Sequence, residues 1–288
     1  PRSDEMNYAV MAQDLVDTLD AQGIERVAVI GHSMGGLVAQ MAAARARTSK
    51  LILLAPSAPW GVSGASLEEA ASAVSLYALG PYWLQAVAPD YGVVRRYSVD
   101  RLPRPVRKAI FARMTAESGR ALWETLNWWL DPFMTTSVAA PGCPVLAIAG
   151  GKDVIHPPAT VRQTAARLGG AVEIFPEMSH WLPGEPGWED VAAMCLDFIA
   201  AEVLDEMPVA LHDFLLRVAV HRADVLVDEL DIYGPGVNLA ARLLWPYARY
   251  ARAFGSDLEP QFEADDVLVL AVNTTRRWRH IEREVSAA

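Results

Sequence analysis

The sequence predicts an α/β protein built on a parallel β-sheet. Short apolar runs rich in β-branched residues alternate with segments of helical periodicity, first over residues 4–54 and again over residues 144–203. This alternation is typical of parallel sheets, in which helices connect successive strands. A Gly-His-Ser-Met-Gly sequence also stands directly between an apolar run and a helical segment, the context of a strand-to-helix turn that carries a nucleophile.

The first half of the predicted sheet consists of two helices and two strands. Apolar residues at helical spacing predict a helix over residues 4–22, which Gly23 ends in the position of a C′ glycine. The runs at 26–30 and 51–54 predict parallel strands, because strands covered on both faces are apolar throughout. Residues 37–46, between the two runs, predict the second helix.

The second half resumes after a long interruption. Residues 56–141 have a helical period broken by Pro and Gly, and contain five tryptophans. Strands and helices then alternate again: strand 144–149, helix 158–168, strand 171–175 and amphipathic helix 188–203. We therefore interpret residues 1–203 as one α/β domain with a helical insertion at 56–141, followed by a small α+β appendage at 204–288.

Composition and charge exclude several classes of function. Hydrophobic residues make up 52% and charged residues 21% of the 288 residues, so we expect a large core rather than disorder. The net charge of −10 argues against a nucleic-acid partner, because phosphate binding takes clustered Lys and Arg. No stretch reaches the ~18 apolar residues of a membrane span, and no secretory signal is predicted.

The cysteine content is informative about the compartment. The chain has only Cys143 and Cys195, which cannot cross-link a fold of this size. We expect free thiols in a reducing cytoplasm, with a disulfide as the alternative. We expect no cofactor and no metal.

Ser33 is the candidate nucleophile. Strand, turn and helix would place Ser33 at a sharp bend with strained backbone angles, where side chains at Gly31 and Gly35 would clash. The bend aims Oγ out of the sheet and directs the helix N-terminus, with the Met34 N–H, at a developing oxyanion. His32, inside the bend, is expected to point away from Oγ. The alternative is a glycine-rich turn with an incidental serine.

A serine hydroxyl needs a base to accept its proton. His180 lies in the loop between the strand at 171–175 and the last helix, from which it can reach over the edge of the sheet. Asp153 follows another strand, where functional groups of open α/β sheets collect. It would hold the tautomer of His180 and stabilise the imidazolium. Glu177 and Asp131 are the alternative acids.

These motifs resemble the α/β-hydrolase fold family over residues 1 to about 203, in the chain order Ser, Asp, His. The matching segments are Ala12-Gln-Asp-Leu15, Gly31-His-Ser-Met-Gly-Gly36, Leu51-Ile-Leu-Leu-Ala55, Pro144 to Asp153, and Met178-Ser-His-Trp181. A serine nucleophile disfavours the branches that use aspartate, the haloalkane dehalogenases and epoxide hydrolases. By this resemblance residues 56–141 form the cap domain. Candidate substrate-binding residues are Trp123, Trp128 and Trp181, although buried packing explains any single cap tryptophan equally well.

The resemblance also implies strands before the helix that begins near residue 4, and we expect this chain to lack them. One of their loops supplies the family's second oxyanion donor, so we expect low turnover from this chain. The strand at 26–30 would become an unpaired edge. The nearest segments to cover it are 216–220 and 225–227, and we favour association between chains over pairing within one.

The appendage contains a second resemblance. Residues 216–243, with Val-Asn-Leu-Ala-Ala-Arg-Leu at their end, resemble a fragment of a class III nucleotide cyclase. In that family the matching Asn and Arg steady the transition state, which indicates Asn238 and Arg242. The metal-holding aspartates of the family are absent here, so we interpret the segment as a remnant.

The functional prediction is a serine hydrolase acting through an acyl-enzyme on Ser33. Its partner would be a small, apolar ester-like or other acyl substrate, with no nucleic acid and no membrane. The alternatives are a catalytically impaired binding or regulatory module with a hydrolase shell, and a remnant of a hydrolase–cyclase fusion. Labelling by a serine-reactive fluorophosphonate separates an activated serine from the other cases.

Overall fold

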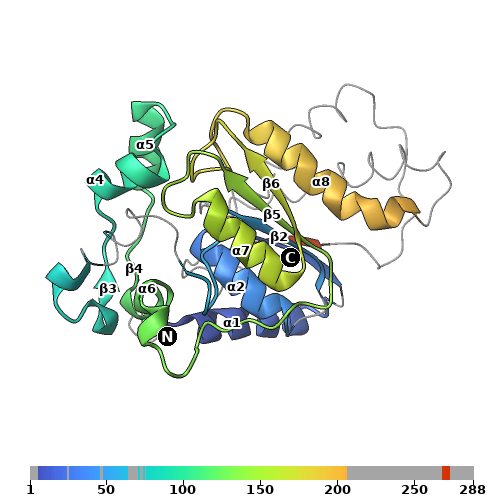
Figure 1. The fold of residues 1–288 in the computed structure, drawn as a ribbon, viewed down its shortest axis with the longest axis horizontal. Helices are drawn as coiled ribbons and strands as arrows, with labels where there is room; N and C mark the ends of the chain where they lie inside the picture. Colours follow the sequence, from blue (N-terminus) through green and yellow to red (C-terminus); the bar gives the residue numbers. More distant parts are fainter. Residues whose placement is uncertain are drawn as a thin grey trace, which may run out of the picture.

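The structure, a computed structural model, describes most of the first 205 residues and one strand of the C-terminal part (Figure 1). The described residues are 6–24, 26–45, 48–63, 71, 74, 76–205 and 268–272. The cyclase-like segment with Asn238 and Arg242 lies outside them, as do the runs at 216–220 and 225–227.

A five-stranded parallel sheet forms the centre of the fold (Figure 1). Its strands in chain order are β1 (Val27–His32), β2 (Thr48–Leu54), β5 (Val145–Gly150), β6 (Ala171–Phe175) and β7 (Leu268–Val272). They lie in the order β6-β5-β2-β1-β7, and every neighbouring pair is parallel. The predicted α/β class is confirmed, and each of the four strands expected in the first 203 residues forms close to its expected bounds.

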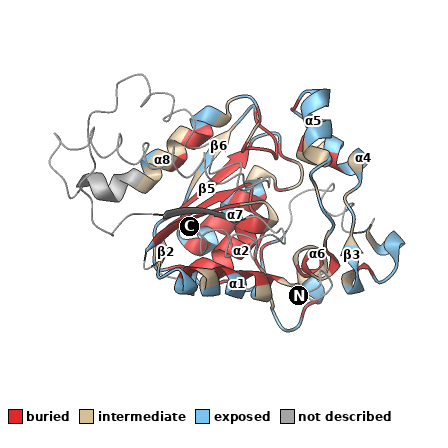
Figure 2. Ribbon diagram, turned by 180° about the vertical axis from the view of Figure 1, so that it is seen from behind, coloured by how far each residue is buried: buried red, intermediate tan, exposed pale blue. Residues whose placement is uncertain are grey.

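Helices cover both faces of this sheet. The helices are α1 (Tyr8–Ala21), α2 (Met34–Ala43), α7 (Pro158–Leu168) and α8 (Trp188–Asp205). Residues of α1, α2 and α7 join one hydrophobic cluster with the sheet, whereas residues of α8 join a second cluster. Buried residues make up most of β1, β2 and β5, whereas the residues of β6 are intermediate or exposed (Figure 2).

Strand β2 shows why the run at 51–54 is apolar at every position. Leu51 and Leu53 belong to the cluster with α1, α2 and α7, whereas Ile52 and Leu54 belong to the cluster with α8. Successive side chains of a strand point to opposite faces of the sheet. Each face is covered by a helix, so alternation of polar and apolar residues would bury polar groups without partners.

The strand that leads into Ser33 is paired on both sides. β1 pairs with β2 on one side and with β7 on the other, with Val27 opposite Leu268 and Gly31 opposite Val272. The expectation that residues 26–30 form an unpaired edge is therefore wrong, and association between chains loses this basis. The covering segment is a run of Leu, Val and Ala later in the chain, which satisfies the N–H and C=O groups that an edge would leave free.

The insertion between β2 and β5 is built from short elements. These are η1 (Tyr77–Leu79), η2 (Tyr82–Leu84), β3 (Ala86–Val87), α4 (Tyr91–Val93), η3 (Val94–Ser98), α5 (Arg104–Phe111), β4 (Glu117–Ser118), α6 (Gly119–Leu126) and η4 (Trp128–Leu130). The sequence predicted a helical insertion, but β3 and β4 add a small antiparallel pair. Helix α6 is tied to α1, because Glu124 accepts a hydrogen bond from the Tyr8 backbone N–H and Thr125 donates one to the Tyr8 hydroxyl.

Both cysteines are free thiols. Burial raises the pKa of Cys195 to about 12 and raises that of Cys143 as well, so both carry a proton near neutral pH. Among the described helices, none combines the length and the apolar character that crossing a bilayer takes.

Candidate active site

Ser33 lies in a tight turn between β1 and α2. Its backbone has φ 54° and ψ −125°, a conformation that a non-glycine residue adopts only under strain. A Cβ on Gly31 would lie 2.4 Å from the Gly35 carbonyl oxygen and 2.6 Å from the Ala39 Cβ. Only glycine at position 31 therefore lets α2 pack this closely against β1.

Hydrogen bonds hold the strained turn from both sides. The Ser33 N–H donates to the Leu54 carbonyl at the end of β2, at 3.0 Å. The Ser33 carbonyl accepts from the N–H groups of Gly36 and Ser57, both at 2.9 Å. Met34 is the first residue of α2, so its N–H belongs to the helix N-terminus, where the backbone favours negative charge.

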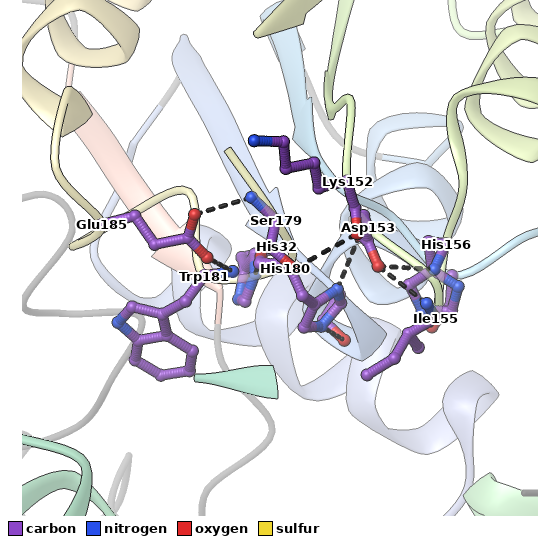
Figure 3. A network of polar contacts seen from close by, with 11 residues as sticks. His32, Lys152, Asp153, Ile155, His156, Ser179, His180, Trp181 and Glu185 are labelled. Atoms are coloured by element: carbon purple, nitrogen blue, oxygen red, sulfur yellow. Dashed lines mark hydrogen bonds and ion pairs between the residues drawn. The ribbon is translucent and has the colours of Figure 1, made fainter. Parts of the chain in front are cut away.

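A chain of hydrogen bonds joins Ser33, His180 and Asp153. Figure 3 shows the part of it between His180 and Asp153. The His180 Nε2 lies 3.0 Å from the Ser33 Oγ, and the His180 Nδ1 lies 2.9 Å from an Asp153 oxygen. Both the His180 and the Asp153 side chains are buried. Because an ionised carboxylate only accepts, Nδ1 carries the proton and Nε2 is left to accept from the Ser33 hydroxyl.

The environment of Asp153 keeps it ionised. Burial alone would raise its pKa, but the neighbouring His180 and further hydrogen bonds lower it to about 2. The Asp153 Oδ1 accepts the backbone N–H groups of Ile155 and His156, at 2.8 and 3.0 Å. The Oδ2 is directed to His180. Each carboxylate oxygen thus has a separate task.

The loops that carry Asp153 and His180 pack directly against one another. The Lys152 N–H donates to the Met178 carbonyl at 2.9 Å. A Cβ on Gly150 would lie 2.0 Å from the Ser179 carbonyl oxygen, so the glycine at the end of β5 permits this approach. The loops after two adjacent parallel strands therefore bring an acid and an imidazole together.

The alternative acids, Glu177 and Asp131, have other partners than His180. Glu177 is exposed and forms an ion pair with Lys152. Asp131 accepts hydrogen bonds from the Phe133 N–H and from the backbone and hydroxyl of Thr135. These contacts give both carboxylates partners other than His180.

The sequence model of the Alpha/beta hydrolase family matches residues 1–194, more than half of the 288-residue chain. The chain belongs to the alpha/beta hydrolase family. A curated relative, the esterase YbfF of Escherichia coli, is 55% identical over 56 residues, which are 19% of this chain and 22% of that protein.

A second curated relative is the dihydrolipoyllysine-residue acetyltransferase component of the acetoin cleaving system of Cupriavidus necator. It is 31% identical over 184 residues, which are 62% of this chain and 48% of that protein. The chain thus spans less than half of the length of either curated relative. Among solved structures, an esterase from Exiguobacterium antarcticum has a TM-score of 0.49 and 18% identity, covering 68% of this chain and 74% of that one.

The rings of two further histidines, His32 and His156, lie beside that of His180. The His32 Nε2 lies 2.9 Å from the His180 carbonyl oxygen, and the His156 Nε2 lies 3.1 Å from the Ser57 Oγ. Burial lowers the pKa of His32 to about 3 and that of His156 to about 4. Both are therefore neutral near pH 7, and His32 donates its Nε2–H to the His180 carbonyl.

The structure adds Glu185, which the sequence reasoning missed. Its carboxylate accepts the backbone N–H groups of Ser179 and Trp181, on either side of His180. A signal was present, because Glu185 is the single charged residue between His180 and Trp188. A charge in so apolar a segment needs specific partners.

The three candidate substrate-binding tryptophans occupy different surroundings. Trp181 is buried and packs edge-on against His32, with 5.5 Å between ring centroids. Trp128 packs edge-on against Trp60, and Trp123 lies under the Arg120 guanidinium. Of the three, Trp181 is the one whose described ring contacts involve a residue adjacent to Ser33.

Within the described part of the chain, His, Cys, Asp and Glu form no group of three or more that could hold a metal ion.

Proposed function

We propose that this alpha/beta hydrolase is a serine hydrolase that cleaves ester-like acyl substrates through an acyl-enzyme on Ser33. The observation that carries the proposal is the hydrogen-bonded chain from the Ser33 Oγ through His180 to Asp153, with distances of 3.0 and 2.9 Å. A nucleophile, a base and an orienting acid in this order are the recurring parts of serine hydrolases on unrelated folds. The short match to an esterase supports an ester as the substrate class.

The geometry suits a two-step acyl transfer. The His180 Nε2 takes the Ser33 proton as Oγ attacks the carbonyl carbon, and Asp153 stabilises the resulting imidazolium. The oxygen of the tetrahedral intermediate accepts the Met34 N–H at the start of α2. His180 then returns the proton to the leaving alcohol, and water repeats the sequence to release the acid and free Ser33.

We assign substrate contact to Trp123, Trp128 and Trp181, with residues 56–141 as a cap over the site. Support comes from the position of the insertion between β2 and β5. Strand β2 ends next to the Ser33 turn, and β5 leads into the Asp153 loop. Apolar aromatic walls with few polar groups are typical of sites for small organic ligands. The acyl group is therefore expected to be small and apolar.

The first test compares two serines that each contact a histidine. Ser33→Ala should reduce kcat for short-chain p-nitrophenyl esters by about 10⁶-fold, because His180 then has no hydroxyl group to activate. Ser57→Ala is the matched control, since the Ser57 Oγ also lies 3.1 Å from a histidine nitrogen, that of His156, but the residue is only 1% exposed. It should retain the turnover of the unaltered protein. Hydrolysis that survives Ser33→Ala and disappears in Ser57→Ala would reverse the assignment.

A further inference from the structure

The loop that carries His180 is held by an unusual carboxylate (Figure 3). The Glu185 Oε2 accepts the Ser179 N–H at 2.6 Å, and its Oε1 accepts the Trp181 N–H at 2.9 Å. These two residues flank His180 in the chain. From the other side, His32 donates its ring N–H to the His180 carbonyl at 2.9 Å. The main chain of His180 is thus anchored on three consecutive residues.

The burial of the Glu185 carboxylate at this place costs free energy. Glu185 is 1% exposed, and no Lys or Arg of the described residues forms an ion pair with it. Burial raises its pKa, and the two backbone hydrogen bonds act in the opposite direction. A buried carboxylate without a cation destabilises a fold unless its hydrogen bonds offset the lost hydration. Its presence therefore indicates a task that an apolar side chain would not perform.

That task requires two acceptors on one rigid group. A carboxylate offers an acceptor on each oxygen, so it can bridge two N–H groups that point the same way. A carboxamide offers one acceptor and presents its NH₂ to the second N–H. Hydrogen bonds to an ionised acceptor are also stronger than neutral ones.

We propose that Glu185 is a positioning residue that fixes the His180 ring between Ser33 and Asp153. It holds the backbone on both sides of His180 and touches neither the substrate nor the reacting atoms. This inference rests on the proposed serine hydrolase function. The two ring nitrogens of His180 lie at hydrogen-bond distance from both partners, 3.0 Å from the Ser33 Oγ and 2.9 Å from Asp153. A displacement of about 1 Å at a reacting group can lower turnover by about 100-fold.

The test is Glu185→Gln, with Glu124→Gln as the matched control. Glu124 is also a buried carboxylate that accepts a backbone N–H, but its partners are Tyr8 and Arg120. We expect Glu185→Gln to lower kcat for an ester by about 10- to 100-fold with KM changed less than about 2-fold. Glu124→Gln should lose stability but keep the kcat of the unaltered protein.

A spectroscopic reading separates positioning from general loss of stability. The proton between His180 Nδ1 and Asp153 should give a downfield NMR signal in the unaltered protein and in Glu124→Gln. The signal should broaden or disappear in Glu185→Gln, because a loosened ring exchanges that proton with water. If Glu185→Gln does not fold, Glu185→Asp replaces it, since the shorter side chain keeps the charge but cannot reach both N–H groups.

A folded Glu185→Gln or Glu185→Asp variant with unchanged kcat and an unchanged downfield signal would overturn the inference. So would an equal loss of kcat in Glu124→Gln. The proposed function fails separately, if Ser33→Ala leaves ester hydrolysis intact. A Ser33-dependent enzyme that is indifferent to Glu185 would therefore keep the function and refute only the positioning role.

Discussion

Replacing Asp153 by asparagine is expected to lower ester turnover by about 10⁴-fold while the fold stays intact. The reason lies in the two backbone hydrogen bonds that Asp153 accepts from Ile155 and His156. An asparagine would turn its single oxygen toward those N–H groups and its NH₂ toward the His180 Nδ1. His180 would then carry its proton on Nε2, where it cannot accept the Ser33 hydroxyl proton.

Steady-state hydrolysis of a p-nitrophenyl ester measures this effect, with Glu177→Gln as the control. Glu177 lies on the neighbouring loop and is exposed, paired with Lys152, so its substitution should change turnover less than about 2-fold, because exposed ion pairs contribute little. Circular dichroism should show the same secondary structure in both variants. An Asp153→Asn variant with turnover within 10-fold of the unaltered protein would show that Asp153 does not set the tautomer of His180.

The protein is expected to lose stability steeply between pH 6.5 and pH 4. Burial lowers the pKa of His156 from 6.5 to about 4 and that of His32 to about 3. Below pH 6.5 the unfolded chain binds these protons and the folded chain does not, so acid favours unfolding. The contribution of the two neutral rings to the free energy of unfolding is complete above pH 6.5. It falls as the pH approaches the lowered pKa values of the two histidines. The lowered pKa of Asp153 adds a further loss only below 3.8.

Denaturant unfolding at a series of pH values tests this, with His156→Gln as the informative variant. The interval from 6.5 to about 4 for His156 corresponds to about 3 kcal/mol of pH-dependent stability. His156→Gln removes the titrating group while keeping a side chain that can bond to the Ser57 hydroxyl. Its free energy of unfolding should depend less on pH over this interval. An identical pH slope in the variant would show that His156 does not contribute to the acid sensitivity.

The parts of the fold that the sequence predicted are those in which local composition reflects burial. The strands at 26–30, 51–54 and 144–149 were predicted because a parallel strand with helices on both faces admits only apolar residues. Ser33 stood out because strand, glycine-rich turn and helix follow without a gap. His180 and Asp153 stood out because each follows a strand of the same sheet.

The parts that were missed depend on contacts between distant segments. The pairing of β1 with residues 268–272 could not be read from either strand alone, since several later runs have similar β-branched composition. Glu185 was missed because its role is defined by which N–H groups it accepts, and a sequence does not show the conformation of a loop. The small β3–β4 pair within the insertion was missed for a related reason, because two-residue strands carry no periodic signal.

The central claim is that the Ser33 hydroxyl is activated by His180, and covalent labelling tests it most directly. A fluorophosphonate reacts with an activated serine, and mass spectrometry of the digested protein locates the adduct. We expect a single phosphonyl group on Ser33, formed by the folded protein and absent from Ser33→Ala and from heat-denatured protein. No adduct, or an adduct on Ser57, would contradict the account.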